Sequence, residues 1–432
     1  MRGARREILP ALTGLRFIAA LSVAVSHSLA VMTNMPNGEP MWHHWLQYSS
    51  AFGMSAFFVL SGFVIHYNYA EPITVYGFRG VTNFFAARFA RLYPLYLVCL
   101  VLSLYDHGYF FPLIVGTPHV TGDFWTLLPR YLTMTQSWTY SVVGSNALIY
   151  GYPFSVVIAD TWSISTEFFF YLIYPFVCFG FTRLRRPLQT LVVAGLLVTC
   201  ALALLYLAYA HGGAIDQFGV QHFGPIAGLA NGYQDSFLRW LIYFAPYSRL
   251  PEFLLGCLIA VLYQQLESRE PLAIERRLGQ LLPYVAIIVI IGFVLIITSS
   301  RNPFPFLAFL HQNFGLALPV AVLIFCVARY QNAIGRVLSS NWMVLCGDAS
   351  YSIYMLHPLI VRNAGLDAVP IGTSSTLTSV VLMRMMIALI ATVGFSLLTY
   401  RALEVPARRL LRRLLTVGTG MPVASTQSTA YR

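Results

Sequence analysis

The sequence contains no lysine, little charge of either sign and no long stretch of balanced polar composition. Only 10% of its 432 residues are charged, whereas a soluble domain usually carries about 25%. The scarcity of charge argues against a soluble globular protein. The lack of a long polar stretch leaves no room for a separate soluble domain.

Closely spaced cysteines are also missing. The six cysteines form no CxxC pair, and all of them fall in or at the ends of apolar runs. We therefore predict neither a disulfide framework nor a metal site. The sequence also shows no Gly-rich phosphate loop and no internal repeat.

Apolar runs of nearly 20 residues are what the sequence has in abundance, and 57% of its residues are hydrophobic. Each run is long enough to cross a hydrocarbon core of about 30 Å as a helix. We predict an all-α fold, a polytopic membrane helix bundle of about ten transmembrane helices. The predicted spans are 11–33, 49–70, 88–106, 161–180, 190–210, 242–264, 281–299, 311–329, 342–363 and 378–400. We interpret residues 107–160 as a long outer loop with a possible return into the membrane.

The arginines alternate between the two sides of this topology. With the N-terminus inside, the inner connections and the tail hold 20 of the 27 arginines, and the outer connections hold five. Because short cytoplasmic loops carry the positive charge, both termini are predicted to be cytoplasmic. The net charge of +11 then reflects orientation in the lipid membrane, and we expect no nucleic acid partner. Residues 1–415 form the predicted membrane domain, and 416–432 form a disordered cytoplasmic tail.

Ionisable side chains at bilayer depth are costly and therefore point to function. Arg16 and His27 share the first span and lie about 16 Å apart along its axis. Imidazole suits proton abstraction near neutral pH, so His27 is a candidate general base. The alternative is a buried histidine whose ring is satisfied by a backbone carbonyl.

A second candidate is the arginine pair Arg88 and Arg91. Residues three apart share one face of a helix, and two guanidinium groups there suit a phosphate or pyrophosphate. The alternative is that both arginines only extend to the membrane interface.

Glu167 lies about two turns inside a predicted span, where an unpaired carboxylate is expensive, so it needs an Arg or His partner. Arg249 and Glu252 are close enough in sequence to pair. That pair is interpreted either as functional or as a structural ion pair at a helix start. Tyr351 and His357 belong to one aromatic-rich late segment and complete the candidate set.

At these residues the sequence resembles the acyltransferase-3 family of bacterial integral membrane O-acyltransferases, over nearly the whole chain from Leu12 to Pro406. The resemblance rests on seven motifs in the family's order. They are Arg16-X10-His27, residues 57–63, Arg88-X-X-Arg91, residues 161–167 with 169–171, residues 249–253, residues 350–354 with His357, and Glu404-Val405-Pro406.

The resemblance implies an acyl-CoA donor, expected to be acetyl-CoA, used as a substrate from the cytoplasm rather than held as a permanent cofactor. It implies a carbohydrate hydroxyl as acceptor, on a cell-surface glycan, a lipid-linked sugar or a glycosylated small molecule. It also implies a multi-pass protein of the bacterial inner membrane. The expected catalytic residues are His27, Glu167, Arg16 and His357. The expected donor-binding residues are Arg88, Arg91, Arg249 and Tyr351.

Within this scheme His27 is the general base, Glu167 orients it, and Arg16 and His357 assist binding or stabilise the oxyanion. An acyl-His27 intermediate is the second possible route. A secondary transporter or exporter of a saccharide-like molecule is the alternative function. Some family members carry an appended SGNH hydrolase-like domain; about 30 residues follow the last predicted span here, so we expect a stand-alone form. An oligomer is possible, and the oligomeric state stays open.

Overall fold

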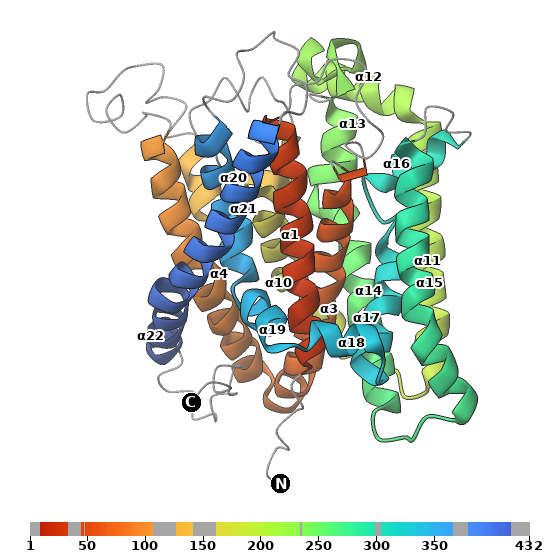
Figure 1. The fold of residues 1–432 in the computed structure, drawn as a ribbon. Coiled ribbons are helices and arrows are strands. Elements are labelled where there is room, and N and C mark those ends of the chain that lie inside the picture. Colours follow the sequence, from red (N-terminus) through yellow and green to blue (C-terminus); the bar gives the residue numbers. More distant parts are fainter. Residues whose placement is uncertain are drawn as a thin grey trace.

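The computed structural model describes residues 9–32, 45–46, 48–106, 127–140, 161–233, 236–298, 304–365 and 379–415. Helices that pack side by side in one bundle dominate these residues, and no strand occurs among them (Figure 1). The predicted all-α helical bundle is confirmed. The predicted tail at 416–432 and the stretches 107–126 and 141–160 of the predicted outer loop lie outside the described residues.

Within the described part of the chain, eight helical segments are long and apolar enough to cross a membrane. Six of them are single helices: α1 (Pro10–Met32), α3 (Ser49–Tyr76), α4 (Phe78–Asp106), α10 (Trp162–Phe181), α11 (Pro187–Ala210) and α15 (Ala273–Thr298). The other two are composite, namely α13 (Phe237–Arg239), η6 (Trp240–Phe244) and α14 (Pro246–Leu266), and α21 (Ser379–Thr399), η7 (Tyr400–Glu404) and α22 (Val405–Leu415).

Two further apolar segments occupy the remaining predicted spans. The helices α19 (Asn341–Asp348) and α20 (Ser350–Gly365) form one segment bent by 67°. The other contains α17 (Ala317–Arg329), a shorter apolar helix that follows α16 (Pro305–His311). The short elements between the long helices are η1 (Gln136–Trp138), α12 (Gly212–Phe223), η3 (Pro225–Ala227), η4 (Leu229–Asn231) and α18 (Ala333–Leu338).

The connections that the arginine pattern assigns to the cytoplasm gather at one end of the bundle, the lower end in Figure 1. They are residues 77, 182–186, 267–272 and 330–340. The helix α1 begins and α22 ends at this same end (Figure 1). The first connection is a single residue, Gly77, whose φ of 54° with ψ of -126° favours glycine. This arrangement agrees with an even number of crossings.

The helices at the centre of the bundle approach one another closely through glycine. A Cβ on Gly62 of α3 would collide with the carbonyl oxygen of Phe253 in α14. A Cβ on Gly256 of α14 would in turn collide with the carbonyl oxygen of Val59 in α3. Small residues allow such backbone contact where no hydrophobic effect drives helices together in lipid. This contact fixes α3 against α14.

The described part of the predicted outer loop, residues 127–140, packs back onto the bundle. Gln136 is fully buried, and its Nε2 donates to the carbonyl oxygen of Thr161 at 3.1 Å. The Oγ of Ser137 lies 2.9 Å from the Oγ of Ser165. These contacts hold the first turns of α10, which carry Glu167 toward the centre of the bundle.

Candidate active site

A pocket with an empty volume of about 570 Å³ opens between α1, α3, α4, α10 and α20. Its lining includes four of the predicted site residues, which are far apart in the sequence: Arg16, Arg91, Glu167 and Tyr351. The remaining lining residues are the hydroxyl-bearing Ser61, Ser163, Ser350 and Tyr354 and the apolar Met54, Phe57, Phe58, Leu92 and Ile164. The pocket therefore joins two guanidinium groups and one carboxylate to a largely apolar wall.

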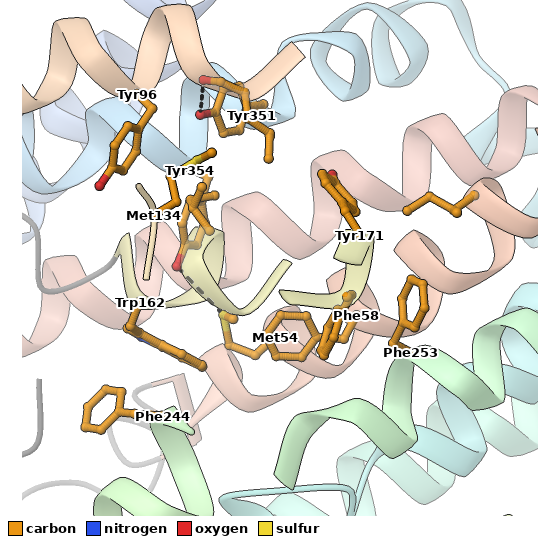
Figure 2. Packing of buried hydrophobic residues seen from close by; sticks show 14 of the residues in the cluster. Met54, Phe58, Tyr96, Met134, Trp162, Tyr171, Phe244, Phe253, Tyr351 and Tyr354 are labelled. Carbon is orange, nitrogen blue, oxygen red and sulfur yellow. Dashed lines mark hydrogen bonds between the residues drawn. The ribbon is translucent and has the colours of Figure 1, made fainter. Parts of the chain in front are cut away.

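The apolar wall of the pocket is built from closely packed rings (Figure 2). Met54 lies among Phe58, Trp162 and Tyr354 in this view. The rings of Phe58 and Trp162 meet edge to face with centroids 6.1 Å apart, a favourable aromatic geometry. Such a wall accepts uncharged groups and gives a charged group few partners.

Glu167 is held by two hydroxyl groups. The Oγ of Ser61 donates to Oε1 of Glu167 at 2.9 Å, and the hydroxyl of Tyr171 donates to the same oxygen at 2.5 Å. Glu167 also interacts electrostatically with Arg16 and Arg88. The carboxylate therefore balances positive charge at the pocket, and its described hydrogen bonds come from Ser61 and Tyr171.

Arg88 and Arg91 share α4 but lie in different surroundings. Arg88 is only 6% exposed, and its guanidinium carbon lies 4.7 Å from the ring centroid of Tyr69 and 5.9 Å from that of Tyr171. Its Nε has no hydrogen-bond partner among the described residues. Arg91 is half-buried and lines the pocket. Arg91 is thus the member of the pair that meets the pocket directly.

His27 and His357 form a hydrogen-bonded pair. Nδ1 of His27 lies 2.9 Å from Nε2 of His357, and the two rings stack with centroids 5.1 Å apart and an interplanar angle of 28°. His357 is fully buried, and its Nδ1 lies 2.7 Å from the carbonyl oxygen of Tyr354. The imidazole beside His27 is therefore that of His357. The two described hydrogen bonds to Glu167 come instead from Ser61 of α3 and Tyr171 of α10.

The histidine pair lies one hydrogen-bonded layer behind the pocket. Tyr354 lines the pocket, and its hydroxyl accepts a hydrogen bond from Oγ of Ser163 at 2.7 Å. The carbonyl of the same tyrosine contacts His357, which contacts His27. The histidines themselves are not among the residues that line the pocket.

Arg249 is not among the residues that line the pocket. It is 2% exposed, its Nη1 lies 3.3 Å from Oε2 of the fully buried Glu252, and its Nε donates to the carbonyl oxygen of Tyr243 at 3.0 Å. Ser55 donates to the other oxygen of Glu252 at 2.6 Å. The local ion pair considered from the sequence is present. A role for Arg249 in donor binding stays a prediction.

Tyr351 is buried at the edge of the pocket, and its hydroxyl donates to the carbonyl oxygen of Leu92 at 2.8 Å. This bond ties α20 to α4 beside Arg91. The phenol of Tyr351 therefore positions the pocket wall as well as lining it.

The sequence interpretation missed three residues that the structure brings to the site, namely Ser61, Tyr171 and Tyr354. Tyr171 had a readable signal, because it stands four residues after Glu167 and residues at this spacing meet on a helix. Ser61 and Tyr354 lie inside recognised motifs, but no spacing rule connects residues on different helices.

Comparisons with known proteins show similarity to acyltransferases. A family model described as an acyltransferase domain matches residues 9–401. The acyltransferase MdmB of Streptomyces mycarofaciens is 26% identical over 428 residues, which cover 97% of each chain.

Two further relatives are longer than this chain. YrhL of Bacillus subtilis (strain 168), provisionally named a peptidoglycan O-acetyltransferase, is 25% identical over 93% of this chain and 55% of its own length. The O-acetyltransferase OatA of Staphylococcus aureus (strain NCTC 8325 / PS 47) is 23% identical over 82% of this chain and 51% of its own length. The chain thus spans about half the length of these two relatives. No solved structure matches the chain.

Proposed function

This chain belongs to the acyltransferase-3 family and is a multi-pass membrane O-acyltransferase, and from that premise we propose its substrates and chemistry. The proposed donor is acyl-CoA, with acetyl as the acyl group, and the proposed acceptor is a hydroxyl of a carbohydrate. One observation carries the proposal: a pocket with two arginines and an apolar wall lies next to a hydrogen-bonded histidine pair.

The donor side of the proposal follows from the distribution of charge in the pocket. Arg16 lies six residues into α1 from Pro10, so it is about 9 Å from the end of the helix where the inner connections gather. CoA carries phosphates that cannot enter hydrocarbon, and guanidinium groups bind phosphate with charge-assisted hydrogen bonds. We assign the phosphates to Arg91 and Arg16, and the apolar arm with its thioester to the wall formed around Met54 and Phe58.

The chemistry is assigned to His27. Its imidazole takes the proton of the acceptor hydroxyl while the hydroxyl oxygen forms a bond to the thioester carbonyl carbon. The carbon–sulfur bond then breaks, and the departing thiolate recovers the proton from His27, which leaves an O-acyl ester and free CoA thiol. A base in the correct position contributes roughly 10²–10⁴ in rate.

The acceptor class rests on a relative, and the location rests on the apolar helices and the arginines. The name of the relative YrhL specifies peptidoglycan, which supports a carbohydrate hydroxyl as the acceptor class. The long apolar helices support a membrane location, and the collected arginines support the cytoplasmic side for the end of the bundle where the inner connections gather. We therefore place the protein in the cytoplasmic membrane of a bacterium.

Purified protein in liposomes is expected to release free CoA thiol from acetyl-CoA and to transfer a labelled acetyl group to soluble peptidoglycan fragments. Thiol release is measured with a chromogenic disulfide, and transfer is measured by mass spectrometry of the fragments. Protein-free liposomes are the control. Uptake of fragments into the vesicles without any consumption of the thioester would instead favour the transporter alternative.

Arg91→Ala is expected to raise the apparent KM for acetyl-CoA by roughly 10- to 100-fold, because a hydrogen bond to a charged group contributes about 1.5–3 kcal/mol. Arg183→Ala is the matched control, since Arg183 is an exposed arginine on a predicted inner connection. Initial rates over a range of acetyl-CoA concentrations give the KM of each variant. An unchanged KM in the Arg91 variant would support the alternative that Arg91 only extends to the membrane interface.

A further inference from the structure

The hydrogen bonds around a neutral His357 assign the protons of the histidine pair. Nδ1 of His357 lies 2.7 Å from the carbonyl oxygen of Tyr354. A carbonyl only accepts hydrogen bonds, so this nitrogen must carry the proton. In the neutral imidazole the lone pair then lies on Nε2, which is the atom that faces His27.

The same reasoning continues into the second ring. When His357 is neutral its Nε2 accepts, so Nδ1 of His27 at 2.9 Å donates and carries the proton of that ring. In neutral His27 the lone pair is therefore on Nε2, on the side of the ring away from Nδ1. That nitrogen is the one able to take a proton from a hydroxyl.

The sequence supplies the carbonyl that anchors this arrangement. In an α-helix the carbonyl of residue 354 accepts from the backbone N–H of residue 358. Residue 358 is Pro358, inside α20, and proline has no N–H. The carbonyl of Tyr354 therefore loses its usual helical donor. It accepts a hydrogen bond from Nδ1 of His357 instead. In lipid such a freed backbone group requires a replacement partner.

We propose that His357 is a positioning residue that sets the tautomer and ring orientation of His27 through a chain of hydrogen bonds from the carbonyl of Tyr354. His357 takes the place that a carboxylate holds in a Ser-His-Asp triad, but it does so as a neutral group. A neutral positioner suits this site, because His357 is fully buried and a buried charge without compensation is costly.

This proposal rests on the proposed function, since it assumes that His27 is the base. It assigns His357 no contact with the donor or acceptor. The expected signature of the role is therefore a fall in kcat with an unchanged KM for acetyl-CoA.

Three substitutions at His357 separate positioning from packing. His357→Leu removes every polar atom. His357→Asn keeps a donor near the carbonyl of Tyr354 but is too short to present an acceptor to His27. His357→Gln offers an amide donor and an amide oxygen with a spacing similar to that of the two ring nitrogens, so it can serve both partners.

We expect His357→Leu and His357→Asn to lower kcat by about 10²–10⁴, with the KM for acetyl-CoA within about two-fold of wild type. His357→Gln should recover kcat to within roughly ten-fold of wild type. Thermal melting in detergent shows which variants are folded. The Asn and Gln variants keep the comparison valid if the leucine variant fails to fold.

Two results would overturn the proposal. One is near-wild-type kcat in a folded His357→Asn variant, and the other is a folded His357→Gln variant as inactive as His357→Asn. Failure of the proposed function has a different signature, namely full activity in His27→Ala. Loss of activity in His27→Ala together with full activity in His357→Asn would contradict the positioning role alone.

Discussion

His27→Ala is expected to remove detectable acyl transfer, with a fall in kcat of about 10²–10⁴, because the proposed base is lost. His27 is half-buried and meets its partner through one described side-chain hydrogen bond, so the helix should still insert and pack. The rate of thiol release from acetyl-CoA in the presence of peptidoglycan fragments measures the effect.

The control for this substitution is His211→Ala, which removes an exposed histidine just beyond the end of α11. Its turnover should match that of the wild type, and both variants should elute as monodisperse species in detergent. Turnover by a folded His27→Ala variant at the wild-type rate would refute the assignment of the base.

A rapid quench distinguishes the two routes open to His27. If His27 acts as a base, labelled acetyl is found on CoA and on the acceptor and never on the protein. If His27 carries the acyl group, labelled protein accumulates when the acceptor is withheld, and the label maps to the peptide that contains His27.

Glu252→Leu is expected to be the most destabilising single substitution among the site residues. It leaves the guanidinium of Arg249 buried at 2% exposure without its carboxylate. Breaking a buried ion pair from one side costs about 3–5 kcal/mol, so the folded yield and the melting temperature in detergent should fall sharply.

The double variant Arg249→Met, Glu252→Leu is expected to recover most of that loss, since apolar replacements of a whole buried pair are often nearly neutral. Arg269→Gln is the control: Arg269 is 53% exposed and bonds Glu275 at 3.0 Å, a surface pair worth about 0–1 kcal/mol. A folded double variant with an unchanged KM for acetyl-CoA would make Arg249 a structural residue. A raised KM in that variant would support the predicted role in donor binding.

Much of the fold was predictable because the membrane allows few solutions. Backbone groups in hydrocarbon must be satisfied within the protein, which favours helices, and apolar runs near 20 residues identify those helices directly. Each of the ten predicted spans overlaps a described helix or helix pair, and the two least regular ones are the bent pair α19–α20 and the short α17. Neither Pro358 nor the short length of α17 changes the overall topology, which the arginine pattern already indicated.

The site was predictable as a set of residues but not as an arrangement. Charged and titratable groups inside apolar runs stand out in any sequence, so Arg16, His27 and Glu167 could be found without coordinates. Their partners could not be found, because hydrogen bonds between helices depend on rotations and offsets that sequence spacing does not record. The carboxylate expected to orient His27 is bonded to Ser61 and Tyr171, and the ring beside His27 comes from 330 residues further along the chain.

The sequence alone determined that the chain is a helical membrane protein with acyltransferase motifs, because hydrophobic length and intramembrane charge are local properties of the chain. Only the tertiary structure decided which of those polar groups meet. Glycine contacts such as that of Gly62 with Phe253 set the distance between helices. Pro358 removes the helical hydrogen-bond donor of one backbone carbonyl in α20. Those contacts bring His357 to His27 and Arg91 to the pocket.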